Sequence, residues 1–216
     1  MQTEIQRIYR GKRTVTERRG RLIVFEGLDG TGKTTLSKSF AAAIGAVWTT
    51  TPGDDVRAQL RAQADIVFAD DPISQQLFYA TSVAHESRTI AKMLAQGRDV
   101  VVDRYWLSTW VYAQTRTAWL DLAAIENALI PADWTILVEL PDGERRQRLQ
   151  SRGTTAADRL TLNADMAAKL RGLYRLGLKR PVAGKGYTLD ASGLNEEAAV
   201  EQTSKIIADY SWRLAG

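Results

Sequence analysis

Apolar residues occur along this chain in short unbroken runs, separated by longer segments whose apolar positions recur every three or four residues. Short runs bounded by turn residues are typical of strands, and the longer periodic segments are typical of amphipathic helices. The runs predict strands at 22–25, 46–50, 100–102, 134–140 and 187–190. The periodic segments predict helices at 35–44, 55–64, 72–97, 107–117, 120–129, 142–152, 163–178 and 195–212.

Strands and helices alternate through the chain, which is the order expected for a parallel sheet with helices on both faces. The valines at 100–102 lack polar alternation, as suits a strand that is buried on both sides. With 216 residues, the chain is long enough for one α/β domain and its core. We therefore expect a doubly wound parallel β-sheet flanked by helices over 21–216, preceded by a basic extension at 1–20.

A glycine-rich segment joins the first predicted strand to the helix that follows it. It reads Gly27-Leu28-Asp29-Gly30-Thr31-Gly32-Lys33-Thr34, a G-x-x-x-x-G-K-T pattern. Glycine permits backbone angles closed to other residues, so the loop amides can converge on a phosphate at the positive end of the helix dipole. Lys33 can reach the β- and γ-phosphates, and the Thr34 hydroxyl can hold Mg²⁺. On this motif alone, kinase, GTPase and ATPase remain open. The residues predicted to bind the nucleotide here are Gly27, Asp29, Gly30, Thr31, Gly32, Lys33, Thr34 and Thr35.

A second polar pair follows the valine run. Asp103 and Arg104 end that run, and the carboxyl ends of parallel strands meet at one edge of a sheet. A carboxylate there can bind Mg²⁺ or its water shell, and an arginine can neutralise the transferring phosphoryl group or clamp an acceptor phosphate. The structural alternative makes Asp103 a capping carboxylate and Arg104 half of a surface ion pair. Beside a phosphate-binding loop, we favour the functional interpretation.

A strongly basic segment lies at about 145–160, where small residues at 153–157 interrupt the charges. Such a segment could close over a triphosphate as a lid, exclude water and bring arginines to the γ-phosphate. A charge run is also typical of a solvated helix face, so we expect only one or two of these side chains to act in catalysis. Arg152 and Arg159, nearest the small residues, are the predicted catalytic pair. The arginines of the segment that we considered are Arg145, Arg146, Arg148, Arg152 and Arg159.

Charge and cysteine content narrow the class of protein. The net charge is +4, yet seven basic and only two acidic residues fall within 1–21. This arm could touch nucleic acid, but a solvated extension is the simpler interpretation because Tyr9 is its only aromatic residue. The chain has no cysteine, and no apolar run approaches the roughly 18 residues of a membrane helix or has the form of a secretory signal. We expect a cytoplasmic protein with a small-molecule substrate, no membrane contact and no nucleic-acid partner.

Taken in order, the motifs from residue 21 onward resemble those of thymidylate kinases. The resemblance rests on the phosphate loop at 25–35 and on five further segments. These are Thr49-Thr50-Thr51-Pro52-Gly53, Leu77-Phe78-Tyr79-Ala80, Asp103-Arg104-Tyr105 with Ser108 and Tyr112, Arg152-Gly153 with Asp158-Arg159, and Leu189-Asp190-Ala191. The loop alone occurs in many families, whereas this spaced combination is much more specific. The resemblance implies the fold of a P-loop nucleotide kinase with a small arginine-rich lid, ATP as co-substrate, Mg²⁺ and a homodimer.

The resemblance also implies roles for single residues. Asp29 would face the sugar hydroxyl of the acceptor, and Phe78 would stack on its base. Arg61 falls close to an arginine that lies beside the acceptor phosphate in bacterial members. Asp190 and Ala191 would lie near the adenine of ATP. The predicted acceptor contacts are Asp29, Thr50, Arg61, Phe78, Ser82, Arg104, Ser108, Trp110 and Tyr112.

Several positions depart from the family pattern. Thymidylate kinases usually have the sequence Thr-Arg-Glu-Pro-Gly at the segment that corresponds to residues 49–53. In this chain Thr50 takes the place of the arginine that would bind the acceptor monophosphate, and Thr51 takes the place of the acid. The arginine expected near thymine is Ser82, and an expected amide is Trp110, which could stack on a base or belong to the core. Loss of a charge-assisted bond to phosphate typically costs roughly 1.5–3 kcal/mol. We therefore expect an intact donor half, a rebuilt acceptor half and no strict specificity for dTMP.

Three functional hypotheses follow. The first is an ATP-dependent phosphotransferase of thymidylate kinase type that acts on a nucleoside monophosphate or nucleotide-like acceptor. The second is a kinase of a nucleoside or another small hydroxylated metabolite, which would need a carboxylate such as Glu26 or Asp29 near the reacting hydroxyl. The third is a nucleotide-binding regulator without catalysis. The sequence has no Asn-Lys-x-Asp element to read guanine, which argues against a GTPase. We favour the first hypothesis.

Overall fold

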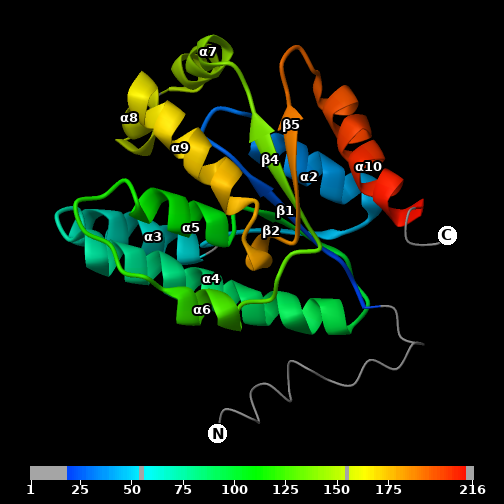
Figure 1. Cartoon of the computed structure of the whole chain (residues 1–216), viewed down its shortest axis with the longest axis horizontal. Helices are drawn as coiled ribbons and strands as arrows, with labels where there is room; N and C mark the ends of the chain where they lie inside the picture. The colour runs from blue at the N-terminus through cyan, green and yellow to red at the C-terminus, as the bar shows by residue number, and fades with distance from the viewer. Residues whose placement is uncertain (1–18, 54–55, 154–155, 213–216) are drawn as a thin grey trace, which may run out of the picture.

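The computed structural model describes residues 19–53, 56–153 and 156–212. The predicted basic extension at 1–20 therefore lies almost entirely outside the described residues, as does the middle of the small-residue stretch at 153–157. Within the described chain, strands and helices alternate (Figure 1). None of the described helices is both long and apolar enough to cross a membrane.

The strands form one parallel sheet. They are β1 (Leu22–Glu26), β2 (Val47–Thr50), β3 (Val100–Asp103), β4 (Trp134–Glu139) and β5 (Lys185–Asp190). Their order is β2-β3-β1-β4-β5, and every neighbouring pair is parallel. The doubly wound α/β fold is therefore confirmed. From the central β1 the chain first builds the β2–β3 side and later the β4–β5 side, and ligands of such sheets bind outside the strand ends at this switch point.

Helices cover both faces of the sheet. In Figure 1, α4, α5, α6 and α9 lie on one face, α2 and α10 lie on the other, and α7 and α8 follow the carboxyl end of β4. The helices are α2 (Lys33–Ile44), α3 (Val56–Val67), α4 (Pro72–Ala95), α5 (Trp106–Ala113), α6 (Ala123–Ala128), α7 (Asp142–Arg152), α8 (Ala156–Leu162), α9 (Ala164–Gly177) and α10 (Glu196–Trp212), with a 3-10 turn at Pro181–Ala183.

Two stretches differ from the sequence prediction. The helix expected at 107–117 already ends at Ala113, and the Thr115 hydroxyl donates to the carbonyl of Tyr112 (2.8 Å) where the chain turns. The small residues expected to be a flexible stretch instead include the start of α8. Buried polar contacts hold this short helix, because the Thr161 hydroxyl donates to the carbonyl of Asp158 (3.0 Å) and accepts from Arg145 (3.1 Å). Composition alone could not show such contacts.

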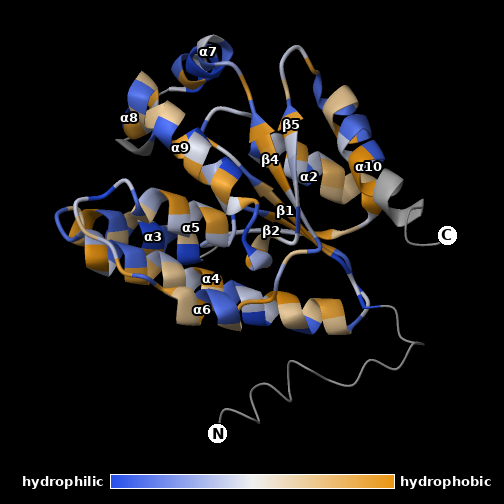
Figure 2. Ribbon diagram, viewed as in Figure 1, coloured by the Kyte–Doolittle hydropathy of each residue, from blue (hydrophilic) through white to orange (hydrophobic). Residues whose placement is uncertain are grey.

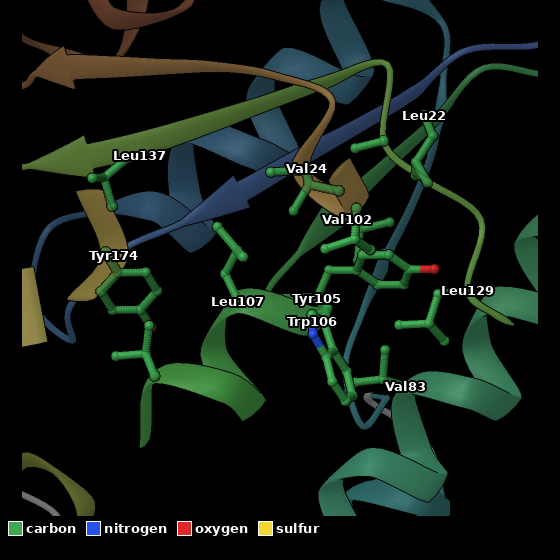
Figure 3. Close-up of a cluster of buried hydrophobic side chains, with 14 of the residues drawn as sticks. Leu22, Val24, Val83, Val102, Tyr105, Trp106, Leu107, Leu129, Leu137 and Tyr174 are labelled. Carbon is green, nitrogen blue, oxygen red and sulfur yellow. The ribbon is translucent and has the colours of Figure 1, made fainter. Parts of the chain in front are cut away.

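Alternate side chains of β1 enter two different cores. Leu22 and Val24 pack with residues of α4, α5 and α9, whereas Ile23 and Phe25 pack with residues of α2 and α10. This alternation follows from the two-residue period of a strand. Figure 2 shows the same layering, with apolar strands between helices that are apolar on one side. Figure 3 shows the first core, where the ring of Tyr105 lies among strand side chains. Packing on both faces fixes the strand ends that carry the polar residues described next.

Candidate functional site

The glycine-rich loop leaves the carboxyl end of β1 and turns directly into α2. Gly32 is the N-cap of α2, has a left-handed backbone (φ 88°) and offers no capping side chain to the first-turn amides. These amides and the positive end of the helix dipole therefore face the loop as an anion-binding group. Gly30 also needs to be glycine, because its φ is 85° and a Cβ there would lie 2.7 Å from Cγ of Leu149 on α7.

Other loop residues hold its shape. The Thr31 hydroxyl donates to the carbonyl of Leu28 (3.0 Å), and a Cβ on Gly27 would lie only 2.4 Å from the carbonyl oxygen of Val138. Thr35 is exposed in the first turn of α2. The loop is therefore packed against β4 on one side and open towards solvent on the other.

Lys33 points back into the loop from the first turn of α2. Its side chain is only 5% exposed, and its Nζ donates to the carbonyl of Leu28 (3.2 Å) and lies 3.5 Å from Oδ1 of Asp29. Burial and the neighbouring charge of Arg104 lower the pKa of Lys33, against the attraction of Asp29 and Asp103. Two cations thus repel one another at this loop, and a bound polyphosphate would relieve the repulsion.

Asp29 joins the loop to the arginine at the end of β3. Its carboxylate forms an ion pair with Nη2 of Arg104 and accepts a hydrogen bond from the Tyr112 hydroxyl (3.2 Å). Burial opposes ionisation of Asp29, but the charges of Arg104 and Lys33 outweigh burial and hold its pKa well below the usual range. The structure therefore brings Asp29, Arg104 and Tyr112 together around an ionised carboxylate.

Arg104 has an unusual backbone. Its φ is 68°, the only positive φ of a non-glycine residue in the described part of the chain. Its N–H donates to the carbonyl of Phe25 (2.9 Å), and its Nη1 donates to Ser108 Oγ (2.9 Å) and to the Tyr174 hydroxyl (3.2 Å). Strained backbones of this kind persist where surrounding contacts fix them, and they cluster at functional sites. The guanidinium is therefore held in a defined direction at the sheet edge.

Glu26, the last residue of β1, ties the start of α5 to the site. It is wholly buried, and its carboxylate accepts from the N–H groups of Tyr105 (2.9 Å) and Ser108 (3.2 Å) and from Ser108 Oγ (2.6 Å). Burial raises the pKa of Glu26, against these hydrogen bonds and the charge of Arg104. Since donors occupy both its oxygens, Glu26 positions Ser108 and is poorly placed to act as a base.

Thr34, in the first turn of α2, meets Asp103, the last residue of β3. The Thr34 hydroxyl donates to Oδ2 of Asp103 (2.5 Å), whereas Oδ1 of Asp103 is buried and has no hydrogen-bond partner among the described residues. A buried carboxylate oxygen without a partner is costly unless a ligand satisfies it. A hydroxyl and a carboxylate at this place are hard oxygen donors, the type that Mg²⁺ prefers.

The helix α7 lies over the loop and brings two arginines to it. Arg145 is wholly buried, and its Nη1 donates to the carbonyl of Asp29 (3.2 Å) and to Thr161 Oγ1 (3.1 Å). Nη1 of Arg148 lies 3.1 Å from the place that a Cβ on Gly32 would take. Arg145 is therefore a tie between the loop and α8, and Arg148 presents a guanidinium at the N-terminus of α2.

The predicted lid pair lies farther along the same segment. Arg152 forms an ion pair with the buried Asp158 (2.7 Å), and Arg159 lines a surface pocket together with Asn163 and Lys169. No hydrogen bond or ion pair between described residues joins either arginine to the phosphate loop. Their catalytic role stays a prediction.

Sequence reasoning did not select Arg148, although a signal for it exists. Leu149 is the one large apolar residue of α7, and its side chain is fully buried. It marks the face of α7 that is turned to the loop, and Arg145 lies one turn before it on that face. Arg148 lies one turn after Arg145, so the spacing to Arg145 is the sequence signal that points to it.

Residues of β2, α3 and α4 form the predicted acceptor side. Phe78 and Ser82 lie one turn apart on α4, where Ser82 Oγ donates to the carbonyl of Phe78 (3.0 Å). The Thr50 hydroxyl donates to the carbonyl of Asp103 (2.9 Å). Nε of Arg61 donates to the Tyr79 hydroxyl (3.2 Å). The polar groups at these predicted positions are thus engaged within the protein.

Trp110 does not join the other predicted acceptor residues. Ser108 and Tyr112 lie one turn apart on α5 and contact Glu26 and Asp29, whereas Trp110 lies half a turn away from both. Its ring packs under the guanidinium of Arg180, 4.7 Å from the ring centroid, and against the first core. Of the two interpretations of Trp110, this packing favours a residue of the core over a second surface for base stacking.

The two residues predicted near adenine lie at the end of β5. The N–H of Ala191 donates to the carbonyl of Glu139 (2.9 Å), and Oδ1 of Asp190 accepts from the N–H of Ser192 (2.9 Å). They lie at the same carboxyl edge as the phosphate loop, two strands away from β1. No other finding bears on their role.

The site has the arrangement of a P-loop nucleotide kinase. The phosphate loop with its lysine follows the central strand, an arginine ends the neighbouring strand, and a helix that carries arginines lies over the loop.

The sequence model of the thymidylate kinase family matches residues 25–198. A thymidylate kinase of Cereibacter sphaeroides is 32% identical over 199 residues, which cover 82% of this chain and 90% of that protein. A probable thymidylate kinase of Pyrococcus horikoshii is 31% identical over 170 residues, which cover 72% and 82%.

Solved structures agree on the fold. The thymidylate kinase of Candida albicans superposes with a TM-score of 0.69 at 21% identity and covers 91% of this chain and 94% of its own. The thymidylate kinase of Ehrlichia chaffeensis superposes with a TM-score of 0.63 at 20% identity, with coverage of 88% and 99%. The chain belongs to the thymidylate kinase family. It is an ATP-dependent nucleotide kinase and therefore a phosphotransferase.

Proposed function

We propose that this enzyme transfers the γ-phosphoryl group of Mg·ATP to a nucleoside monophosphate and that it is not strictly specific for dTMP. The observation that carries the proposal is a pair of cations, the buried Lys33 and the partly buried Arg104, at the carboxyl edge of β1 and β3. One belongs to the phosphate loop and the other to the adjacent strand end, so the transferring phosphoryl group would lie within reach of both.

Each residue has a task in this proposal. The loop amides and Lys33 bind the phosphates of ATP, and the dipole of α2 adds to the attraction. Arg104, fixed by Asp29, Ser108 and Tyr174, stabilises charge on the phosphoryl group as it crosses. A guanidinium of the lid, Arg148 or the predicted Arg152 and Arg159, adds charge and excludes water. A phosphate acceptor is already anionic, so the reaction needs no strong base.

Thr34 and Asp103 fit a magnesium ion. The unpaired, buried Oδ1 of Asp103 and the adjacent Thr34 hydroxyl form a donor set of the right chemistry. When bound, Mg²⁺ supplies positive charge to the β- and γ-phosphate oxygens. The described residues include no cluster of three or more His, Cys, Asp or Glu side chains, so the phosphates and water would complete the coordination.

The residues on the acceptor side support the proposal that the enzyme is not strictly specific for dTMP. In this proposal Phe78 stacks on the base of the acceptor, and Asp29 with Tyr112 contacts its sugar. Thr50 and Ser82 replace the arginines that the family uses for the phosphate and near thymine, and both hydroxyls bond within the protein. The related Candida albicans enzyme has a broad substrate specificity. We propose the same for this chain.

An acceptor screen tests the function. Purified enzyme with ATP and magnesium is given each nucleoside monophosphate and each matching nucleoside, and ADP release and the phosphorylated product are measured. We expect conversion of at least one monophosphate other than dTMP to its diphosphate. Turnover of nucleosides alone would contradict the proposal and favour the kinase of hydroxylated metabolites. ATP binding without turnover of any acceptor would favour a regulator.

We further propose that the enzyme is a cytoplasmic homodimer. Large apolar side chains are exposed at Leu60, Ile66 and Val67 on α3, at Leu77 on α4 and at Trp119. An apolar surface of this kind is typical of a protein interface. Light scattering after gel filtration should give twice the chain mass, and Ile66→Glu should shift the protein to monomer. A monomeric wild-type protein at micromolar concentration would contradict the dimer.

A further inference from the structure

Residue 50, the last of β2, is a threonine where the resemblance to thymidylate kinases implies an arginine, and its hydroxyl is already hydrogen-bonded within the protein. The Thr50 hydroxyl donates its one hydrogen to the carbonyl of Asp103 (2.9 Å), and the N–H of Thr51 points to the same carbonyl (3.3 Å). Thr50 therefore holds the edge of the sheet together and cannot stand in for a guanidinium. A monophosphate acceptor at this loop needs a cation from another position.

Arg57, in the first turn of α3, brings a guanidinium back onto this loop. Gly53 has a φ of +121°, and a Cβ built on it would lie 2.4 Å from Nε and 2.7 Å from Cζ of Arg57. The guanidinium therefore lies directly against the α-carbon of Gly53. A side chain at residue 53 would displace it, so the glycine is needed for the close approach as well as for its backbone angle.

Glu86 fixes the direction of that guanidinium. Its buried carboxylate forms an ion pair with Nη1 of Arg57 and accepts from the Thr49 hydroxyl (2.7 Å). Glu86 lies on α4 at the four-residue spacing that continues the line of Phe78 and Ser82, so these three share one helix face. The carboxylate thus sets Arg57 on the same side as the ring predicted to hold the acceptor base.

A second observation points to a ligand at this loop. Oγ1 of Thr51 is buried, and it has no hydrogen-bond partner among the described residues. A buried hydroxyl in this state is satisfied when an external oxygen comes within reach. Thr51 precedes Gly53 by two residues, so the unsatisfied hydroxyl and the guanidinium belong to the same short segment.

We infer that Arg57 binds the phosphate group of the acceptor, in place of the arginine that residue 50 lacks, with Glu86 as its positioning residue. A planar guanidinium can serve a carboxylate on one edge and a phosphate on another. The anion would then lie at the carboxyl edge between Arg57, which follows β2, and Arg104, which follows β3. This inference rests on the proposed function, because it assumes an acceptor that carries a phosphate.

The test compares Michaelis constants for the two substrates. Arg57→Ala alone would leave the buried carboxylate of Glu86 without its cation, so the variant that we choose is Arg57→Met with Glu86→Gln. Arg98→Ala is the control at the opposite, amino edge of the sheet. At saturating ATP, the KM of the monophosphate should rise about ten- to a hundredfold, the effect of losing a charge-assisted phosphate contact. The KM of ATP should change less than about twofold, and the control should match the wild type.

Adding Thr50→Arg to this double variant separates a binding role of Arg57 from a structural role. If Arg57 only stabilised the loop, a new arginine at residue 50 would not change the acceptor KM. A guanidinium supplied from β2 should lower the acceptor KM again by roughly tenfold. An acceptor KM within about fivefold of wild type in the double variant, an equal rise in both KM values, or failure of Thr50→Arg to restore binding would overturn the inference. If the wild type phosphorylates no monophosphate at all, the proposed function itself fails, and that result is visible before any variant is made.

Discussion

The proposed donor half and the proposed acceptor half of this site differ in how they are built. The donor half is one continuous stretch, from the end of β1 through the glycine loop to Lys33, and backbone amides form most of it. The acceptor half is assembled from side chains of β2, α3, α4 and α5. A backbone cradle cannot be altered without changing the loop, whereas side chains on separate elements can be exchanged one by one. This difference in construction would explain why the resemblance to thymidylate kinases implies an intact donor half and a rebuilt acceptor half.

The largest expected effect is on the donor half. Lys33→Ala removes the buried ammonium that would bind the phosphates, so kcat should fall on the order of a hundred- to a thousandfold. Steady-state ADP release measures the change, and Lys38→Ala, an exposed lysine of the same helix, is the matched control. The melting temperature should stay close to that of wild type. Near-normal turnover of Lys33→Ala would break the donor assignment.

Asp29 links the two halves, and its replacement should cost stability. Asp29→Asn leaves Arg104 and Lys33 without their shared anion, so unfolding should become easier by about 3 kcal/mol at neutral pH. Because the folded-state pKa of Asp29 is lowered, its contribution is present above the ordinary carboxyl pKa of about 3.9 and is lost as the pH falls below it.

Thermal melts from pH 3 to pH 8 check this expectation. The difference between wild type and Asp29→Asn should be constant above about pH 5 and should shrink towards pH 3. Asp165→Asn, at an exposed position on α9, is the control for removal of a surface carboxylate. A difference that grows on acidification would contradict the ion-pair account.

Thr50→Arg in the wild-type background sharpens the comparison on the acceptor side. If residue 50 faces the acceptor as the alignment of this loop implies, a second guanidinium beside Arg57 should lower the KM of the monophosphate by roughly threefold to tenfold. The gain is smaller than in the Arg57 variant because one cation is already present. Initial rates at saturating ATP measure it, and an unchanged or higher KM would show that residue 50 does not face the acceptor.

The smallest effect is expected at Trp110. Its ring packs under Arg180 on the far stripe of α5, so Trp110→Leu should change the acceptor KM by less than about twofold. The variant should still melt at a lower temperature, because it loses ring packing and a cation–π contact of about 1 kcal/mol. A tenfold rise in acceptor KM with unchanged stability would return Trp110 to the acceptor site.

Sequence patterns predicted the sheet and the phosphate loop because both depend on local information. Unbroken valines mark β3, and the order of strand, glycines and lysine marks the loop regardless of distant contacts. The start of α8 could not be predicted, since Thr161 and Arg145 stabilise it across 16 residues of sequence. The pairing of Arg57 with Glu86, on which its proposed role depends, could not be predicted for the same reason, because the two residues lie 29 apart in the sequence. Side-chain pairs between elements are set by packing, which a single sequence does not display.

The difference between the two halves is tested most directly by calorimetric titration of two ligands against two variants. A non-hydrolysable ATP analogue with magnesium and the preferred monophosphate are each titrated into wild type, Lys33→Ala and the Arg57→Met, Glu86→Gln double variant. The account predicts that Lys33→Ala weakens only the ATP analogue and that the double variant weakens only the monophosphate, each by at least about tenfold. Loss of the same ligand in both variants, or of neither ligand, would contradict it.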